Sequence, residues 1–148
     1  MSLEQISLLS FTSENQLNIK SNQLQLTINQ KTKCSGSLEP LEYMLVGFAA
    51  CINAVGHQVA AELDMELKSI QIEIKGTINT AKTQGFNVKE RSGFENIDLV
   101  LKPVTNADLT TLKFWMDEIK ERCPVYDNLL HVTPVNLVVT KDYTTKVA

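Results

Sequence analysis

Two of the three cysteines of this chain stand where thiol chemistry is possible. Cys123 lies in the segment ERCPVYDNL directly before Pro124, where a helix is expected to end. Arg122 and Lys120 are close in sequence and, with the backbone N–H groups of a following helical turn, would favour a thiolate. Cys51 lies in the apolar segment GFAACINAVGH, where a buried and inert thiol is the simplest interpretation. A solvent-edge cysteine without function is the alternative for Cys123.

The other potentially reactive side chains complete no known motif. Cys34 lies in a polar loop and is interpreted as incidental. His57 follows Cys51 by six positions, so the two do not share a helix face, and we expect a histidine of the core or of an interface. His131 precedes the last predicted strand. No CxxC, HExxH, GxGxxG, Walker or GxSxG sequence is present, so we predict no metal site, no nucleotide site and no serine hydrolase.

Composition narrows the class of protein. A length of 148 residues suits one domain, 1–148, and a net charge of −3 without a basic cluster argues against nucleic-acid binding. The N-terminal residues show no signal-peptide pattern, and an odd cysteine count is typical of free thiols in a reducing compartment. We therefore expect a cytoplasmic protein.

One apolar stretch raises the question of a membrane span. Tyr43 to Ala61 contains no charged residue, but Asn53, His57 and Gln58 interrupt it. A span needs about 20 mainly apolar residues, so we expect a buried helix and no membrane partner.

The central elements of the fold follow from hydrophobic periodicity. Alternating apolar residues around Gln16 to Ile28 predict a hairpin with its turn at Ser21-Asn22. Glu39 to Asp64 is predicted to be a helix, opened by Pro40 and apolar on nearly every side. Two further segments alternate and predict strands: Leu67 to Ile78, and Phe94 to Leu101 after a long polar loop.

The last part of the chain is predicted to hold a second helix and a final strand. Thr105 or Asn106 can cap the helix, which should end at Cys123. Its expected apolar stripe is Leu109, Leu112, Trp115 or Met116, and Ile119. Val125 to Leu130 would add one or two helical turns, and Val135 to Val139 a closing strand. The order of elements predicts an α+β fold with antiparallel sheet.

Three segments resemble the OsmC/Ohr family of osmotically induced and organic hydroperoxide resistance proteins. SLEPLEYMLVGFAACINAVGHQVA is similar to the family's central helix, with Cys51 eleven positions after Pro40. FWMDEIKERCPVYDNL, followed by TPVNLVV, is similar to the helix that ends in Cys-Pro-Val and its closing strand. KERSGFENIDLVL resembles the strand before that helix. The resemblance covers about two thirds of the chain, from Leu38 to Val139.

The resemblance implies an intertwined homodimer in which antiparallel sheets wrap around two central helices. It also implies a two-cysteine peroxidase of the antioxidant stress response. Cys51 would attack a small organic hydroperoxide as thiolate, and Cys123 would resolve the resulting sulfenic acid as a disulfide. The resemblance implies no bound cofactor. It does imply an external dithiol reductant, such as a lipoyl group.

The chain departs from the family pattern at the group that assists the attacking thiolate. Peroxidase members place an N-terminal arginine there, oriented by a glutamate directly after the proline. This chain has Leu41 at that position, and Glu42 is the expected substitute. The candidate replacement cations are Lys20, Lys31, Lys33 and Arg91. A second hypothesis is therefore an OsmC-like protein that binds an apolar or thiol-bearing small molecule without peroxidase activity, and a third is an interaction protein with inert cysteines.

Overall fold

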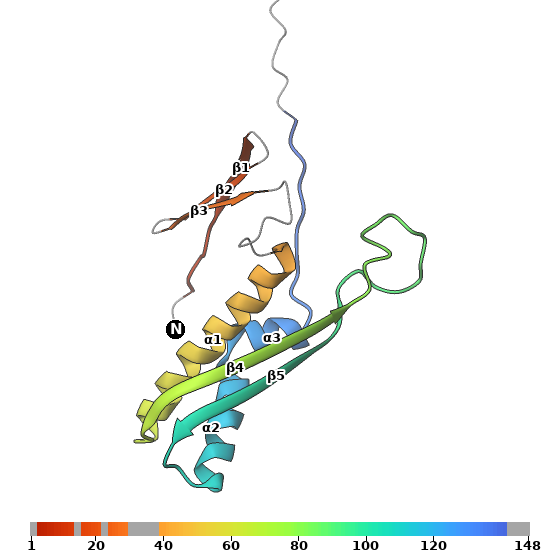
Figure 1. The fold of residues 1–148 in the computed structure, drawn as a ribbon. Coiled ribbons are helices and arrows are strands. Elements are labelled where there is room, and N and C mark those ends of the chain that lie inside the picture. Colours follow the sequence, from red (N-terminus) through yellow and green to blue (C-terminus); the bar gives the residue numbers. More distant parts are fainter. Residues whose placement is uncertain (1–2, 14–15, 22–23, 30–38, 142–148) are drawn as a thin grey trace, which may run out of the picture. The chain divides into compact units, whose positions relative to one another are not determined.

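The computed structural model describes residues 3–13, 16–21, 24–29 and 39–141 (Figure 1). The chain divides into two compact units, Met1–Tyr43 and Met44–Ala148. The elements along the chain are β1 (Leu9–Ser13), β2 (Gln16–Lys20), β3 (Gln25–Asn29), α1 (Pro40–Glu62), β4 (Leu67–Ile78), β5 (Phe94–Thr105), α2 (Leu109–Arg122) and α3 (Pro124–Leu130). The predicted α+β class with antiparallel pairing is confirmed.

The N-terminal unit contains an antiparallel sheet in the order β1-β2-β3. The predicted hairpin is confirmed, with Ile19 opposite Leu26 in β2 and β3. The first strand, β1, was not predicted and pairs with β2 through contacts such as Phe11 opposite Asn18. The ammonium of Lys20 lies 5.6 Å from the centroid of the Phe11 ring, a cation–π contact within this sheet.

Helix α1 is confirmed almost as predicted, beginning at Pro40. Its buried residues follow a helical period along one side: Phe48, Ile52, Gly56, Val59 and Ala60. The predicted burial on nearly every side is not found within the single chain, where Val46 is 50% exposed. By length and composition alone α1 could cross a membrane, and 28% of its most apolar window is buried within the chain.

Strands β4 and β5 form a long antiparallel hairpin with Ile72 opposite Leu101 and Ile74 opposite Leu99. The bounds of β4 are those predicted, whereas β5 continues beyond the predicted end at Leu101 to Thr105. Alternate residues of both strands pack against the helical core, so the hairpin covers α1 and α2 with one face (Figure 1).

The N-cap of helix α2 lies two or three residues after the predicted caps. Asp108 is the N-cap and accepts a hydrogen bond of 2.7 Å from the backbone N–H of Thr111, which lowers the pKa of this carboxyl. A cap at Thr105 or Asn106 was wrong, since Thr105 ends β5 and the Asn106 side chain donates to Glu66. The buried side of α2 carries Trp115 and Ile119, while Leu109 in the first turn is 84% exposed.

The predicted closing strand at Val135 to Val139 is wrong for the single chain. Residues 132–141 form neither helix nor strand. Val135, Leu137 and Val138 are 85%, 91% and 79% exposed, so this apolar segment packs on neither side against its own chain. An extended segment becomes a strand only when a neighbouring strand pairs with it.

Candidate active site

The structure brings together the two cysteines that the sequence singled out. Cys123 Sγ lies 3.2 Å from Cys51 Sγ, and its S–H donates a hydrogen bond to the Cys51 sulfur. Cys51 lies in the middle of α1 and is half-buried, whereas Cys123 follows α2 and is fully buried. Both thiols are free. A short movement of either side chain would bring the sulfurs to the disulfide bond length of about 2.05 Å.

Backbone contacts hold Cys123 in place on both sides. Its N–H donates to the carbonyl of Ile119 at 3.0 Å, which ends α2. Its carbonyl accepts a hydrogen bond of 3.0 Å from the N–H of Asp127, and Pro124 occupies the first position of α3. Because proline cannot donate to the preceding helical turn, the chain changes direction at Cys123.

The surroundings of Cys123 favour its neutral thiol. Burial raises its pKa, and the adjoining Cys51 thiol adds to this effect. The backbone N–H groups of Tyr126 and Val125 act in the opposite direction, as predicted for a following helical turn, but they are outweighed. The Cys123 thiolate that the sequence analysis considered is therefore disfavoured.

The two cations expected to assist that thiolate are paired with carboxylates instead. Arg122 forms ion pairs with Glu62 and Glu118. Lys120 lies 4.0 Å from Asp117 in its own helix. Sequence proximity to Cys123 did not predict where these long side chains point.

Apolar and aromatic residues share the hydrophobic core with the cysteine pair. The rings of Phe48 and Tyr126 stack with centroids 6.2 Å apart, and each ring lies one helical turn from one of the cysteines. Both belong to or pack on the core cluster of Phe48, Ile52, Val59, Ala60, Met65, Trp115, Ile119 and Cys123. Sequence analysis missed the role of Tyr126, although its spacing of three from Cys123 was a usable signal.

The remaining candidate residues have contacts of their own. The exposed carboxylate of Glu42 accepts a 2.6 Å hydrogen bond from the N–H of Glu39, which caps the start of α1. The guanidinium of Arg91 packs against Gly93 of its own loop, and Nη2 lies 2.9 Å from where a Cβ of Gly93 would be. His57, expected in the core or at an interface, is exposed in the single chain. Cys34, Lys31 and Lys33 lie outside the described residues.

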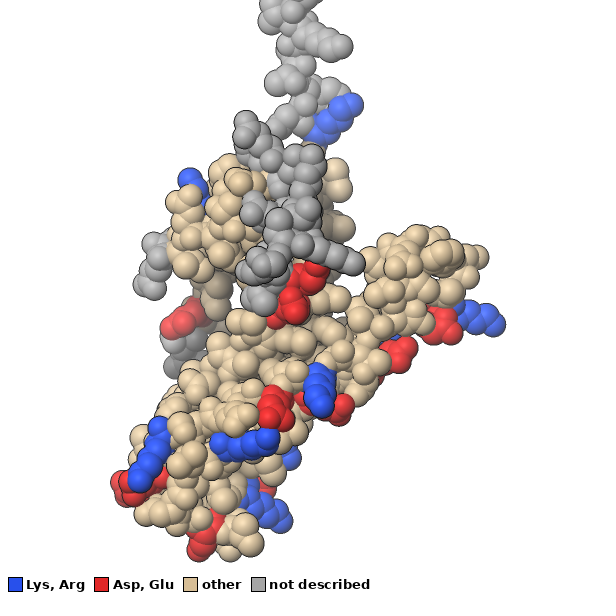
Figure 2. Space-filling view, viewed as in Figure 1, with Lys and Arg blue, Asp and Glu red and all other residues tan. Residues whose placement is uncertain are grey.

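The charged side chains of the described residues do not meet the requirements of a metal site. Within the described residues, no group of three or more His, Cys, Asp or Glu side chains is placed to hold a metal ion. Figure 2 shows acidic and basic side chains interspersed over the face that it presents. The cysteine pair is thus the arrangement best suited to chemistry in the described part of the chain.

Comparisons with known proteins identify the family of this chain. A sequence model described as OsmC-like protein matches residues 30–138. A hydroperoxide reductase of Mycoplasma genitalium is 28% identical over 131 residues, which cover 86% of this chain and 89% of that protein.

Solved structures support the same fold. The crystal structure of an OsmC-like protein from Mycoplasma pneumoniae superposes with a TM-score of 0.74 at 23% identity, covering 87% of this chain and 89% of that one. The organic hydroperoxide resistance protein OhrB of Bacillus subtilis gives a TM-score of 0.55 at 19% identity, covering 85% and 90%. The chain belongs to the OsmC-like protein family, with the OsmC-like fold.

Proposed function

We propose that this protein reduces organic hydroperoxides, with Cys51 as the attacking thiol and Cys123 as the resolving thiol. The observation that carries the proposal is the 3.2 Å contact between the two sulfurs, in which Cys123 is the donor. Burial raises the pKa of Cys123, so its neutral S–H lies beside Cys51 and can donate to the sulfur that attacks. The half-buried Cys51 is also the more accessible of the two thiols.

The proposed reaction has three steps. The Cys51 sulfur attacks the terminal oxygen of the hydroperoxide, the O–O bond breaks, and the alkoxide takes up a proton to leave as alcohol. The Cys123 sulfur then attacks the sulfenic sulfur of Cys51, so that the S–S bond forms and the S–O bond breaks with release of water. An external dithiol, such as a lipoyl group, reduces the disulfide by exchange and returns two electrons and two protons.

The apolar surroundings of the pair support an organic substrate. Phe48 and Tyr126 place aromatic surface one turn from each thiol, and apolar surface favours an alkyl or aryl hydroperoxide over hydrogen peroxide. The relatives named hydroperoxide reductase point in the same direction. For Glu42 we propose the role that the family resemblance implies, which is to orient the cation that assists the attacking thiolate. Its carboxylate is exposed and can bind such a cation.

One experiment tests the proposal as a whole. The reduced protein is treated with one equivalent of cumene hydroperoxide, free thiols are trapped, and disulfides are mapped by mass spectrometry. We expect a Cys51–Cys123 bridge within seconds. If both thiols remain free, or if only Cys34 is oxidised, the peroxidase proposal is overturned and a ligand-binding role becomes the better hypothesis.

We also propose that the active form is a homodimer. The apolar helix α1 leaves Met44 and Val46 exposed at 40% and 50%, and Val135 and Leu137 are almost fully exposed. A single chain of a globular protein rarely leaves so many large apolar side chains in water. A second copy that contributes its own helix and strands would cover it.

The dimer gives a prediction about mass in solution. Sedimentation equilibrium should give about twice the chain mass of 16.5 kDa. Replacing Ala54, which is exposed on α1, with glutamate should shift the protein towards monomer, because a charge would be buried in the interface. The matched control is Lys75→Glu on the exposed side of β4, which should leave the mass unchanged. A monomeric wild-type protein would contradict the proposal.

A further inference from the structure

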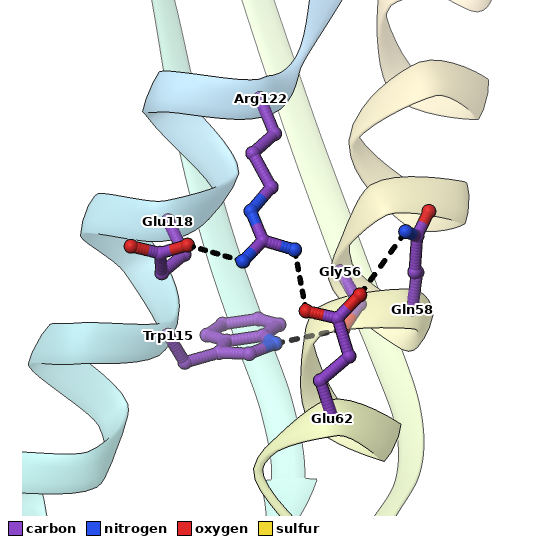
Figure 3. Close-up of polar contacts among 6 residues, drawn as sticks. All are labelled: Gly56, Gln58, Glu62, Trp115, Glu118 and Arg122. Atoms are coloured by element: carbon purple, nitrogen blue, oxygen red, sulfur yellow. Dashed lines mark hydrogen bonds and ion pairs between the residues drawn. The ribbon is translucent and has the colours of Figure 1, made fainter.

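Arg122, the last residue of α2, links the two helices that carry the cysteines. Its Nη1 lies 2.5 Å from Glu62 at the end of α1, and its Nη2 lies 2.6 Å from Glu118 one turn earlier in α2 (Figure 3). Gln58 donates a 3.1 Å hydrogen bond to the second oxygen of Glu62. One guanidinium therefore bridges carboxylates from both helices, which a planar fork with several donors does well.

A second polar contact joins the same helices on the buried side. The indole N–H of Trp115 donates to the carbonyl of Gly56 at 2.8 Å (Figure 3). Gly56 permits this close approach, since a Cβ there would lie 3.0 Å from Ile70 and 3.2 Å from the Trp115 ring. With contacts at Trp115 and Arg122, α2 is held against α1 at two separate points, which restrains both sliding and rotation.

The ion pairs of Arg122 lie close in sequence to the reactive pair. Arg122 directly precedes Cys123 in the chain. The place on α1 at which Arg122 binds therefore helps to set where the Cys123 sulfur meets Cys51. If Arg122 lost its charge, Glu62 and Glu118 would be left as two like charges near one another, which repel. That repulsion would push the ends of α1 and α2 apart.

We propose that Arg122 is a positioning residue that keeps Cys123 beside Cys51 by bridging Glu62 and Glu118, and that it thereby favours the disulfide over the dithiol. The inference rests on the redox role proposed for the pair. The rate and equilibrium of an intramolecular bond depend on how often the reacting atoms occupy the bonding geometry. A tether one residue from the sulfur therefore acts on disulfide formation without touching the reacting atoms.

The test measures the equilibrium of the protein with glutathione, in a Cys34→Ser background. Oxidised glutathione and the two thiols give the Cys51–Cys123 disulfide and two molecules of reduced glutathione, so no hydroperoxide is needed. Arg122→Met should lower the equilibrium constant for disulfide formation roughly three- to tenfold, given the strength of such ion-pair networks. Arg122→Lys should recover part of the loss, because one ammonium cannot bridge both carboxylates as a guanidinium does.

Two comparisons separate positioning from a general loss of stability. Lys120→Met removes the same charge from the same turn of α2, and it should change the constant less than about 1.5-fold because its partner lies within the helix. Glu62→Gln should reproduce part of the Arg122→Met effect. A destabilisation shared equally by the reduced and oxidised forms would leave the constant unchanged.

The outcomes decide the two proposals independently. An unchanged constant in Arg122→Met, an equal fall in Lys120→Met, or failure of the wild-type pair to form a disulfide with glutathione would each overturn the positioning role. A specific fall in Arg122→Met upholds it, even if the protein does not consume cumene hydroperoxide, in which case only the peroxidase proposal fails.

Discussion

Replacing Cys51 with serine is expected to reduce the turnover of cumene hydroperoxide, with dihydrolipoamide as reductant, by roughly a thousandfold or more. A hydroxyl is a far weaker nucleophile than a thiolate at neutral pH, and it cannot form a sulfenic acid. The fully buried Cys123 has a raised pKa, so it should not take over the attack. Turnover is measured as loss of hydroperoxide under steady-state conditions.

Cys123→Ser should behave differently from Cys51→Ser. One equivalent of hydroperoxide should still be consumed, but the reaction should then stop at a Cys51 sulfenic acid, which dimedone traps and mass spectrometry detects. Cys34→Ser is the control and should retain full turnover. Undiminished turnover in Cys51→Ser, or a loss in Cys34→Ser as large as in Cys51→Ser, would refute the assigned roles.

Replacing Trp115 with alanine is expected to lower the free energy of unfolding by about 3–5 kcal/mol. The Trp115 side chain is 2% exposed at the centre of the core, and its loss leaves a cavity between α1, α2 and the β4–β5 hairpin. The buried carbonyl of Gly56 would also lose the indole donor. Urea denaturation of the reduced protein measures the change.

Two variants separate packing from hydrogen bonding in this prediction. Trp115→Phe keeps an aromatic ring but removes the N–H, and its cost should include about 1 kcal/mol for the lost hydrogen bond. Phe114→Ala removes the neighbouring aromatic side chain, which is 53% exposed, and should cost less than about 1 kcal/mol within the chain. If Phe114→Ala destabilised the protein as much as Trp115→Ala, the assigned core would be wrong.

Local sequence patterns were sufficient to predict the elements that border the site. Alternation of Ile70, Ile72 and Ile74 located β4 with its observed bounds, because every second side chain of a strand faces the same side. Pro40 and apolar residues at helical spacing located α1, and the Cys-Pro sequence located the end of α2.

Other features depended on contacts that no short segment reveals. Thr105, Asn106 and Asp108 are all residue types that cap helices well. Thr105 ends β5 and the Asn106 side chain donates to Glu66, so Asp108 takes the role. The segment LSFTS became β1 through pairing with β2. Conversely, Val135 to Val139 has the composition of a strand but pairs with none of the strands in the described part of the chain.

The amino-acid sequence by itself determined the main elements around the site, the two thiols and the resemblance to the OsmC/Ohr family. Only the tertiary structure decided that Cys51 and Cys123, 72 positions apart, lie 3.2 Å from one another. It also decided that Arg122 turns to Glu62, 60 positions away, and not to the neighbouring thiol. Such contacts depend on how α2 packs against α1, and that packing is set by side chains distributed over the whole core.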